Sequence, residues 1–97
     1  DLVGRCGGEE FLAILTNVNS EQLLRVAERA RILVAGSDLS EEGRRVVVTI
    51  SIGATKALSD DTVANLVGRS DKLMYMSKQA GRNRVSHDLE GEPQRVD

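Results

Sequence analysis

A pentapeptide near the start of the chain, Gly-Gly-Glu-Glu-Phe, has residue types that could do chemistry. Gly7 and Gly8 lack a Cβ, so they can adopt the positive φ of a tight turn and leave room for a ligand beside the main chain. Neighbouring residues of a strand point to opposite faces, so Glu9 and Glu10 would have different roles. Carboxylate oxygens bind Mg²⁺ together with substrate phosphates. These residue types would suit a metal and phosphate site, but taken alone they are better explained as a solvated hairpin tip.

A second cluster of candidate residues lies near the C-terminus. Lys78 falls in the last turn of a predicted helix, and Arg82 follows Gly81, which is expected to end that helix. Residues four apart can lie on one side of a helix end, where two cations could hold a phosphate tail. Positive charge is also favourable at a helix C-terminus without any ligand, so this cluster alone does not establish a site.

Hydrophobic patterning predicts the elements that would position both clusters. Apolar runs at 2–6 and 11–15 on either side of the glycine pair predict a β-hairpin. The alternating segment 46–54 predicts a strand, in which small side chains on one face suit close approach by another backbone. Apolar residues recur at helical spacing in 23–34 and in 63–77.

The ends of these elements are predicted from capping and turn residues. Asn19 or Ser20 would cap the first helix, and Asp60 or Asp61 the second. The polar segment 37–45 is expected to be a loop, and 82–86 to be a short final strand. The order predicts an α/β (α+β) sandwich with a mixed, largely antiparallel sheet covered by helices.

Composition limits the classes of function. The 97 residues suffice for one domain, with 40% hydrophobic and 29% charged residues. A formal net charge of −2 provides no field for binding a nucleic-acid polymer. A single cysteine excludes an internal disulfide, and no apolar run has the roughly 20 residues that would span a bilayer. We expect one domain over residues 1–86 and a polar, flexible tail over 87–97.

Three motifs occur in a fixed order along the chain: GGEEF at 7–11, VTISIGA at 48–54 and DKLMYMSKQAGRN at 71–83. Together they resemble the C-terminal half of a GGDEF domain, the diguanylate cyclase family, over about residues 1–86. Ser70 and Ser77 stand where the family has alanine. The resemblance implies a nucleotide-cyclase, palm-like fold, and we expect its N-terminal part to lie outside this sequence.

The resemblance also implies a reaction. Diguanylate cyclases condense two GTP molecules into cyclic di-GMP and two pyrophosphates, with two GGDEF domains facing each other as a homodimer. By this similarity Glu9 would bind Mg²⁺ or Mn²⁺, and Glu10 would act near the metal or the attacking hydroxyl. Gly7 and Gly8 would let the nucleotide lie close to the turn. The β- and γ-phosphates would be held by Lys78 and Arg82.

The resemblance further suggests an inhibitory site for the product. Asp1 stands where the aspartate of the family's inhibitory RxxD motif belongs, and Arg29 on the first helix could contribute to the same surface. Charged residues on an exposed helix face are usually only solvated, and for Arg29 this is the preferred interpretation.

Some properties are expected to depend on the longer protein. The family's first half supplies another metal-binding aspartate and the residues that recognise guanine, so we expect these 97 residues alone to be inactive and to self-associate. The alternative function is a non-catalytic module that binds GTP or cyclic di-GMP for regulation. We expect a cytoplasmic location without membrane contact by this segment, although the parent protein could be membrane-tethered.

Overall fold

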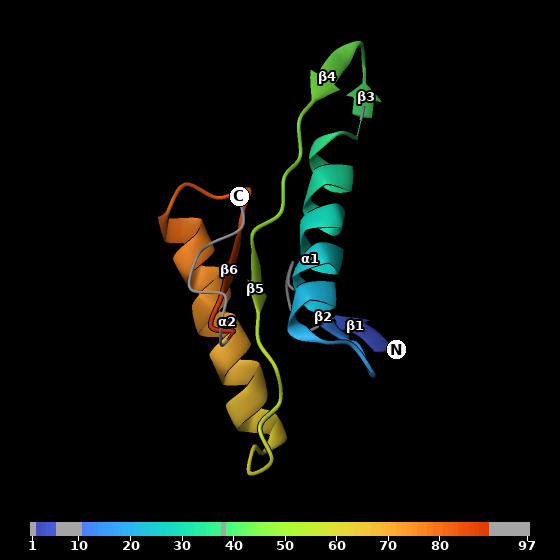
Figure 1. Cartoon of the computed structure of the whole chain (residues 1–97). Coiled ribbons are helices and arrows are strands. Elements are labelled where there is room, and N and C mark those ends of the chain that lie inside the picture. Colours follow the sequence, from blue (N-terminus) through green and yellow to red (C-terminus); the bar gives the residue numbers. More distant parts are fainter. Residues whose placement is uncertain (1, 6–10, 38, 90–97) are drawn as a thin grey trace.

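The computed structural model describes residues 2–5, 11–37 and 39–89, which form two helices and three pairs of strands (Figure 1). The elements in chain order are β1 (Leu2–Arg5), β2 (Phe11–Ile14), α1 (Ser20–Ala35), β3 (Leu39–Glu41), β4 (Arg44–Val46), β5 (Ile52–Ala54), α2 (Val63–Gln79) and β6 (Val85–His87).

The core has three layers, with the β5–β6 pair between α1 and α2 (Figure 1). Alternation along β5 explains this arrangement, because Ile52 and Ala54 join the apolar cluster on the α1 side while Gly53 lies against α2. From β6, Val85 is fully buried in that cluster. The fold is α+β, as predicted from the sequence.

The sense of the central sheet differs from the prediction. β5 and β6 are parallel, with Ile52 opposite Val85 and Ala54 opposite His87. A largely antiparallel sheet beneath the helices was therefore the wrong expectation. The physical reason is the connection: α2 carries the chain from one end of β5 back to its start, so the next strand runs in the same direction.

The antiparallel pairs are hairpins outside this sheet. β1 and β2 pair from Leu2–Ile14 to Arg5–Phe11, which confirms the predicted first hairpin. The predicted loop at 37–45 is wrong, because β3 and β4 form a second hairpin through Glu42 (φ 51°) and Gly43 (φ 76°). Among the described elements, neither hairpin contacts a helix.

The predicted strand at 46–54 is shorter in the structure. Only Ile52–Ala54 pairs with another strand, and Val46 instead ends β4. Val47 is 74% exposed, so alternation at this end of the segment is not matched by burial. A strand pattern defines a strand only where a neighbour supplies hydrogen bonds.

The helix ends follow local chemistry, with one correction. Asn19 caps α1 in a capping box with Gln22, as one of the two predicted candidates. Thr62 caps α2, so the prediction of Asp60 or Asp61 was wrong. The Asp61 carboxylate instead accepts hydrogen bonds from the Leu58 amide and from the side chain of Arg69.

Ordered structure continues beyond residue 86. β6 ends at His87, and Leu89 is buried in the apolar cluster beside α1. Residues 87–89 of the predicted tail are thus part of the fold, because an apolar side chain at position 89 can reach the core. The remainder of that tail, 90–97, lies outside the described residues.

Candidate functional site

The acidic cluster falls in the connection between β1 and β2. Gly7, Gly8, Glu9 and Glu10 lie outside the described residues, as does Asp1. The two strands that lead into and out of this connection are paired in register up to Arg5 and Phe11. The roles of the glycines and glutamates therefore remain predictions carried by the sequence.

The cationic cluster is described, and its backbone is that of a Schellman motif. The Arg82 amide donates to the Ser77 carbonyl at 2.9 Å, and the Gly81 amide to the Lys78 carbonyl at 3.4 Å. Gly81 has a φ of 122°, which glycine adopts without steric cost. The motif ends α2 at Gln79 and fixes the backbone of Arg82 about one turn beyond Lys78.

Two further residues of the same turn have left-handed backbones. Arg82 has a φ of 65° and Asn83 a φ of 49°, so three consecutive residues have positive φ. Left-handed conformations are uncommon for residues other than glycine, and asparagine is among those that tolerate them best. The intrinsic conformational preferences of these residues therefore do not explain the turn, and hydrogen bonds stabilise it. One of them is the 3.0 Å bond from Arg84 Nε to the Arg82 carbonyl.

The Arg82 side chain is exposed, and within the described part of the chain its guanidinium makes no hydrogen bond or ion pair. Lys78 is half-buried and has an interaction partner. A helix C-terminus carries partial negative charge, which repels an anion. Any phosphate bound at this end of α2 would therefore depend on these two cations to offset that repulsion.

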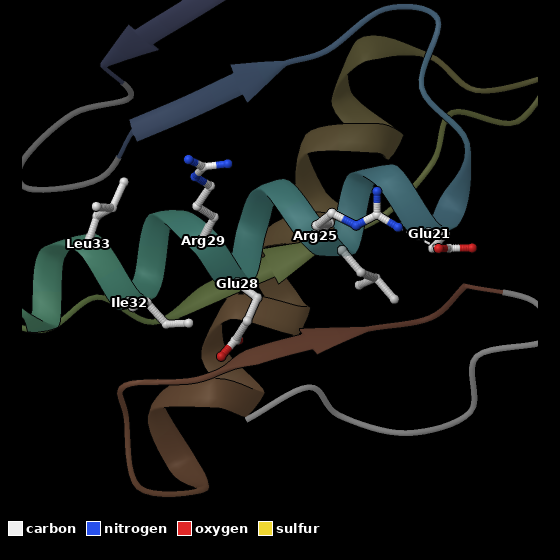
Figure 2. Close-up of a pocket in the computed structure, with 7 residues that line it drawn as sticks. Glu21, Arg25, Glu28, Arg29, Ile32 and Leu33 are labelled. Carbon is white, nitrogen blue, oxygen red and sulfur yellow. Dashed lines mark hydrogen bonds and ion pairs between the residues drawn. The ribbon is translucent and has the colours of Figure 1, made fainter.

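Arg29 lies on a different element, α1. It is exposed, as predicted, and it borders a shallow groove along the helix that also includes Ile32 and Leu33 (Figure 2). Figure 2 shows Arg29 and Glu28 on opposite sides of α1. The structure thus brings Lys78 and Arg82 to one helix end and leaves Arg29 elsewhere.

Two side-chain networks were not predicted from the sequence. The first joins Arg31 of α1 to Asn83 beside the cationic cluster. The second centres on Arg69 of α2, which donates to Asp61, to the Thr55 hydroxyl at 2.9 Å and to the Lys56 carbonyl at 2.8 Å. The partners are between 8 and 52 positions apart and do not belong to one helix or strand, so no helical or strand spacing indicates them.

The Arg69 network has an electrostatic consequence. Hydrogen bonds from Arg69, and then from the Leu58 amide, lower the pKa of Asp61 from 3.8 to about 2. The same pair raises the pKa of Arg69. This network attaches the loop before α2 to the helix. Arg69 and Asp61 form hydrogen bonds with each other and with the loop, so we assign the network a structural role.

The described residues contain neither a clustered metal site nor a membrane-spanning helix. Among residues 2–5, 11–37 and 39–89, no three His, Cys, Asp or Glu side chains gather closely enough to hold a metal ion. No helix within those ranges combines the length and apolar character needed to cross a bilayer.

Comparison with known proteins supplies a family. A model of the diguanylate cyclase GGDEF domain matches residues 1–84. Diguanylate cyclase A of Treponema denticola is 41% identical over 87 residues, covering 89% of this chain and 24% of that protein. Diguanylate cyclase DgcZ of Escherichia coli is 33% identical over 84 residues, covering 87% of this chain and 28% of that protein. The response regulator PleD of Caulobacter vibrioides is 42% identical over 88 residues, covering 88% of this chain and 19% of that protein. The chain spans between 19% and 28% of the length of these relatives.

Proposed function

Because the chain belongs to the GGDEF domain family of diguanylate cyclases, we propose that it forms part of a catalytic domain that condenses two GTP molecules into cyclic di-GMP and two pyrophosphates. The observation that carries this proposal is the family match over residues 1–84, which includes the whole GGEEF sequence. Relatives named diguanylate cyclase at 33% and 41% identity support the same reaction.

The proposed roles divide between the two clusters. Lys78 and Arg82 bind the β- and γ-phosphates and neutralise the charge that grows on the pyrophosphate leaving group. Positioning and charge neutralisation dominate the catalysis of phosphoryl transfer, so two cations at a fixed helix end suit this task. Gly7 and Gly8 allow the nucleotide to approach the main chain of the hairpin.

A divalent cation, Mg²⁺ or Mn²⁺, is part of the proposal. The oxygen donors of Glu9 and Glu10 have the chemistry that such a hard cation requires. When bound, the cation stabilises the attacking and leaving oxygens. In our proposal Glu9 holds it, and Glu10 acts beside it or orients the attacking 3′-hydroxyl.

The assembly and regulation of the domain are also proposed. Each domain binds one GTP, so the reaction requires two domains that face each other as a homodimer. Asp1 and Arg29 are candidates for a site that binds cyclic di-GMP as an inhibitor. The exposure of Arg29 beside a groove on α1 is compatible with that role.

Turnover of GTP by the full-length protein tests the proposal. With Mg²⁺ present we expect cyclic di-GMP and pyrophosphate in a 1:2 ratio, detected by chromatography, and loss of product in Glu9→Gln. Lys78→Ala and Arg82→Ala should raise the KM for GTP. Lys72→Ala and Arg44→Ala, which remove exposed cations elsewhere, serve as matched controls. Equal effects in the controls would contradict the assigned phosphate site.

The alternative is a module that binds GTP or cyclic di-GMP without catalysis. The intact GGEEF sequence favours the enzyme, because a binding module has less need of the metal carboxylate. Metal-dependent GTP binding by the full-length protein without any product would support the alternative. Absence of GTP binding would contradict both.

We also propose that these 97 residues alone do not catalyse the reaction, since the family's first half supplies a further metal ligand and the guanine-binding residues. Incubation of the chain with GTP and Mg²⁺ should give no more product than its Glu9→Gln variant. Product well above that control would contradict this expectation.

A further inference from the structure

The Arg31 side chain, on α1, forms a tertiary hydrogen bond to Asn83, which lies beyond the end of α2. Its Nη1 donates to Asn83 Oδ1 at 2.9 Å and lies 3.5 Å from the Asn83 carbonyl oxygen, although the two residues are 52 apart in sequence. The Arg31 side chain is only 14% exposed. A charged side chain that is this buried needs hydrogen-bonding or ionic partners, because burial of an unpaired charge has a large cost in free energy.

Glu28 supplies the pairing and fixes the direction of the guanidinium. Arg31 Nε donates to both Glu28 carboxylate oxygens, at 3.1 and 3.0 Å, and Nη2 donates to Oε1. The Glu28 side chain is 18% exposed. A two-point contact with a planar guanidinium leaves little rotational freedom, so the remaining nitrogen points toward Asn83.

Asn83 belongs to the turn that carries Arg82. Its φ of 49° follows the φ of 65° at Arg82 and of 122° at Gly81. On one side, the Schellman bond to Ser77 joins Arg82 to α2. On the other side, Arg31 attaches the next residue to α1. Among the described elements, α1 and α2 do not contact each other directly, and both contact β5 and β6. The turn at Arg82 is thus a further connection between the two helices.

We propose that Arg31 is a positioning residue for the phosphate site: through its bond to Asn83 it holds the turn in the conformation that directs Arg82 at the substrate triphosphate. This inference rests on the proposed function, in which Arg82 binds the phosphates. Arg31 itself does not touch the nucleotide. Its effect is to make the Arg82 cation pre-organised, so that less ordering is required when GTP binds.

A double-mutant cycle in the full-length protein tests this role. Arg31→Ala removes the contact, and Asn83→Gly removes the same acceptor while keeping the left-handed backbone accessible. Each is combined with Arg82→Ala, and the KM for GTP, the kcat and the midpoint of thermal unfolding are measured. Arg25→Ala is the matched control, because Arg25 is also on α1 and pairs with a glutamate, Glu21, at the surface.

If Arg82 binds phosphate through charge-assisted bonds, Arg82→Ala should raise the KM roughly tenfold or more. Arg31→Ala and Asn83→Gly should each raise the KM by about three- to tenfold with a smaller change in kcat. In the Arg82→Ala background both effects should shrink to about twofold or less, since the residue they position is absent. Arg25→Ala should leave the KM unchanged.

The outcomes separate the two proposals. If Arg82→Ala leaves the KM unchanged, the phosphate role is wrong and the positioning role is overturned with it. If Arg82→Ala raises the KM but Arg31→Ala and Asn83→Gly do not, the positioning role alone is overturned. Equal fold-changes with and without Arg82 would likewise overturn it, because they would show an effect of Arg31 that does not pass through Arg82. Asn83→Gly provides the answer if Arg31→Ala fails to fold.

Discussion

At the scale of single residues, two charged side chains attach loops to helices through hydrogen bonds that lie outside the regular secondary structure. Arg69 joins α2 to the loop before it through Asp61, Thr55 and Lys56. Arg31 joins α1 to the turn that carries Arg82. Both are arginines, whose several donors in a fixed plane allow one side chain to bond several partners at once.

The Asp61–Arg69 pair makes stability depend on acid pH. The pKa of Asp61 is about 2 in the folded protein against an ordinary value of 3.8, so the folded state binds fewer protons between these values. The stabilisation is complete above about pH 4 and is lost as the pH falls toward 2. We expect Asp61→Asn to flatten the change of the urea midpoint from about pH 5 to about pH 2, whereas Asp60→Asn leaves it intact. Equal slopes in both variants would contradict this prediction.

Ser77 forms a buried hydrogen-bond chain. Its Oγ lies 2.8 Å from the Ile52 carbonyl oxygen and 2.8 Å from Ser86 Oγ, and both serines are essentially fully buried. Since a hydroxyl has one proton, Ser77 donates to the carbonyl and accepts from Ser86. We expect Ser77→Ala to lower the free energy of unfolding by about 1–3 kcal/mol, because the Ser86 hydroxyl loses its acceptor.

Chemical denaturation of the single and double variants checks this chain of bonds. Adding Ser86→Ala to Ser77→Ala should restore part of the lost stability, because no buried hydroxyl is then unpaired. Strict additivity of the two changes would contradict the coupling.

At the scale of elements, the approach of β5 to α2 depends on Gly53. A Cβ at this position would overlap the Ser70 carbonyl oxygen and the Met74 amide nitrogen and would lie 2.8 Å from Leu73 Cβ. Backbone atoms of a helix cannot shift aside as a flexible side chain can. The small residue predicted on this face of the strand is therefore a requirement of the close β5–α2 contact.

We expect Gly53→Ala to destabilise the protein by about 1–3 kcal/mol or more, because the strand and the helix must separate. Gly68→Ala is the matched control: a methyl group at Gly68 would have no neighbouring atom within 4 Å, and Gly68 is inside α2. There the same substitution should stabilise by about 0.5–1 kcal/mol through helix propensity. Urea unfolding of both variants measures the difference, and a neutral Gly53→Ala would contradict the close contact.

At the scale of the whole molecule, several large apolar side chains lie outside the core and are exposed to solvent. The radius of gyration is 14.2 Å, against about 12.5 Å expected for a compact chain of this length. On α1, Val26, Ile32 and Leu33 are 47%, 55% and 65% exposed. Exposed apolar residues gathered on one element are a typical association surface.

We expect the 97-residue chain to self-associate through these exposed apolar residues of α1, and a charge among them to weaken the association. Sedimentation velocity over a range of concentrations should show a rising average mass, and Leu33→Lys should reduce it. Val63→Lys is the control, because Val63 is 79% exposed but lies on α2. A monomer at all concentrations would contradict the expectation.

What the sequence determined by itself is the structure that depends on neighbours along the chain. The α1 cap at Asn19, the end of α2 at Gly81 and the β1–β2 hairpin follow from side chains within a few residues of one another. For the same reason the sequence predicted that Lys78 and Arg82 share a helix end. The acidic half of the candidate site, at Glu9 and Glu10, stays a prediction.

Only the tertiary structure decided the features that depend on distant partners. The length of β5 and its parallel pairing depend on β6, about 30 residues later. Thr62 rather than Asp61 caps α2 because Arg69 engages the aspartate. The Arg31–Asn83 bond joins residues that no periodicity connects. Local hydrogen bonding and hydrophobic period are encoded over a few residues, whereas these contacts exist only after the core has brought α1, the sheet and α2 together.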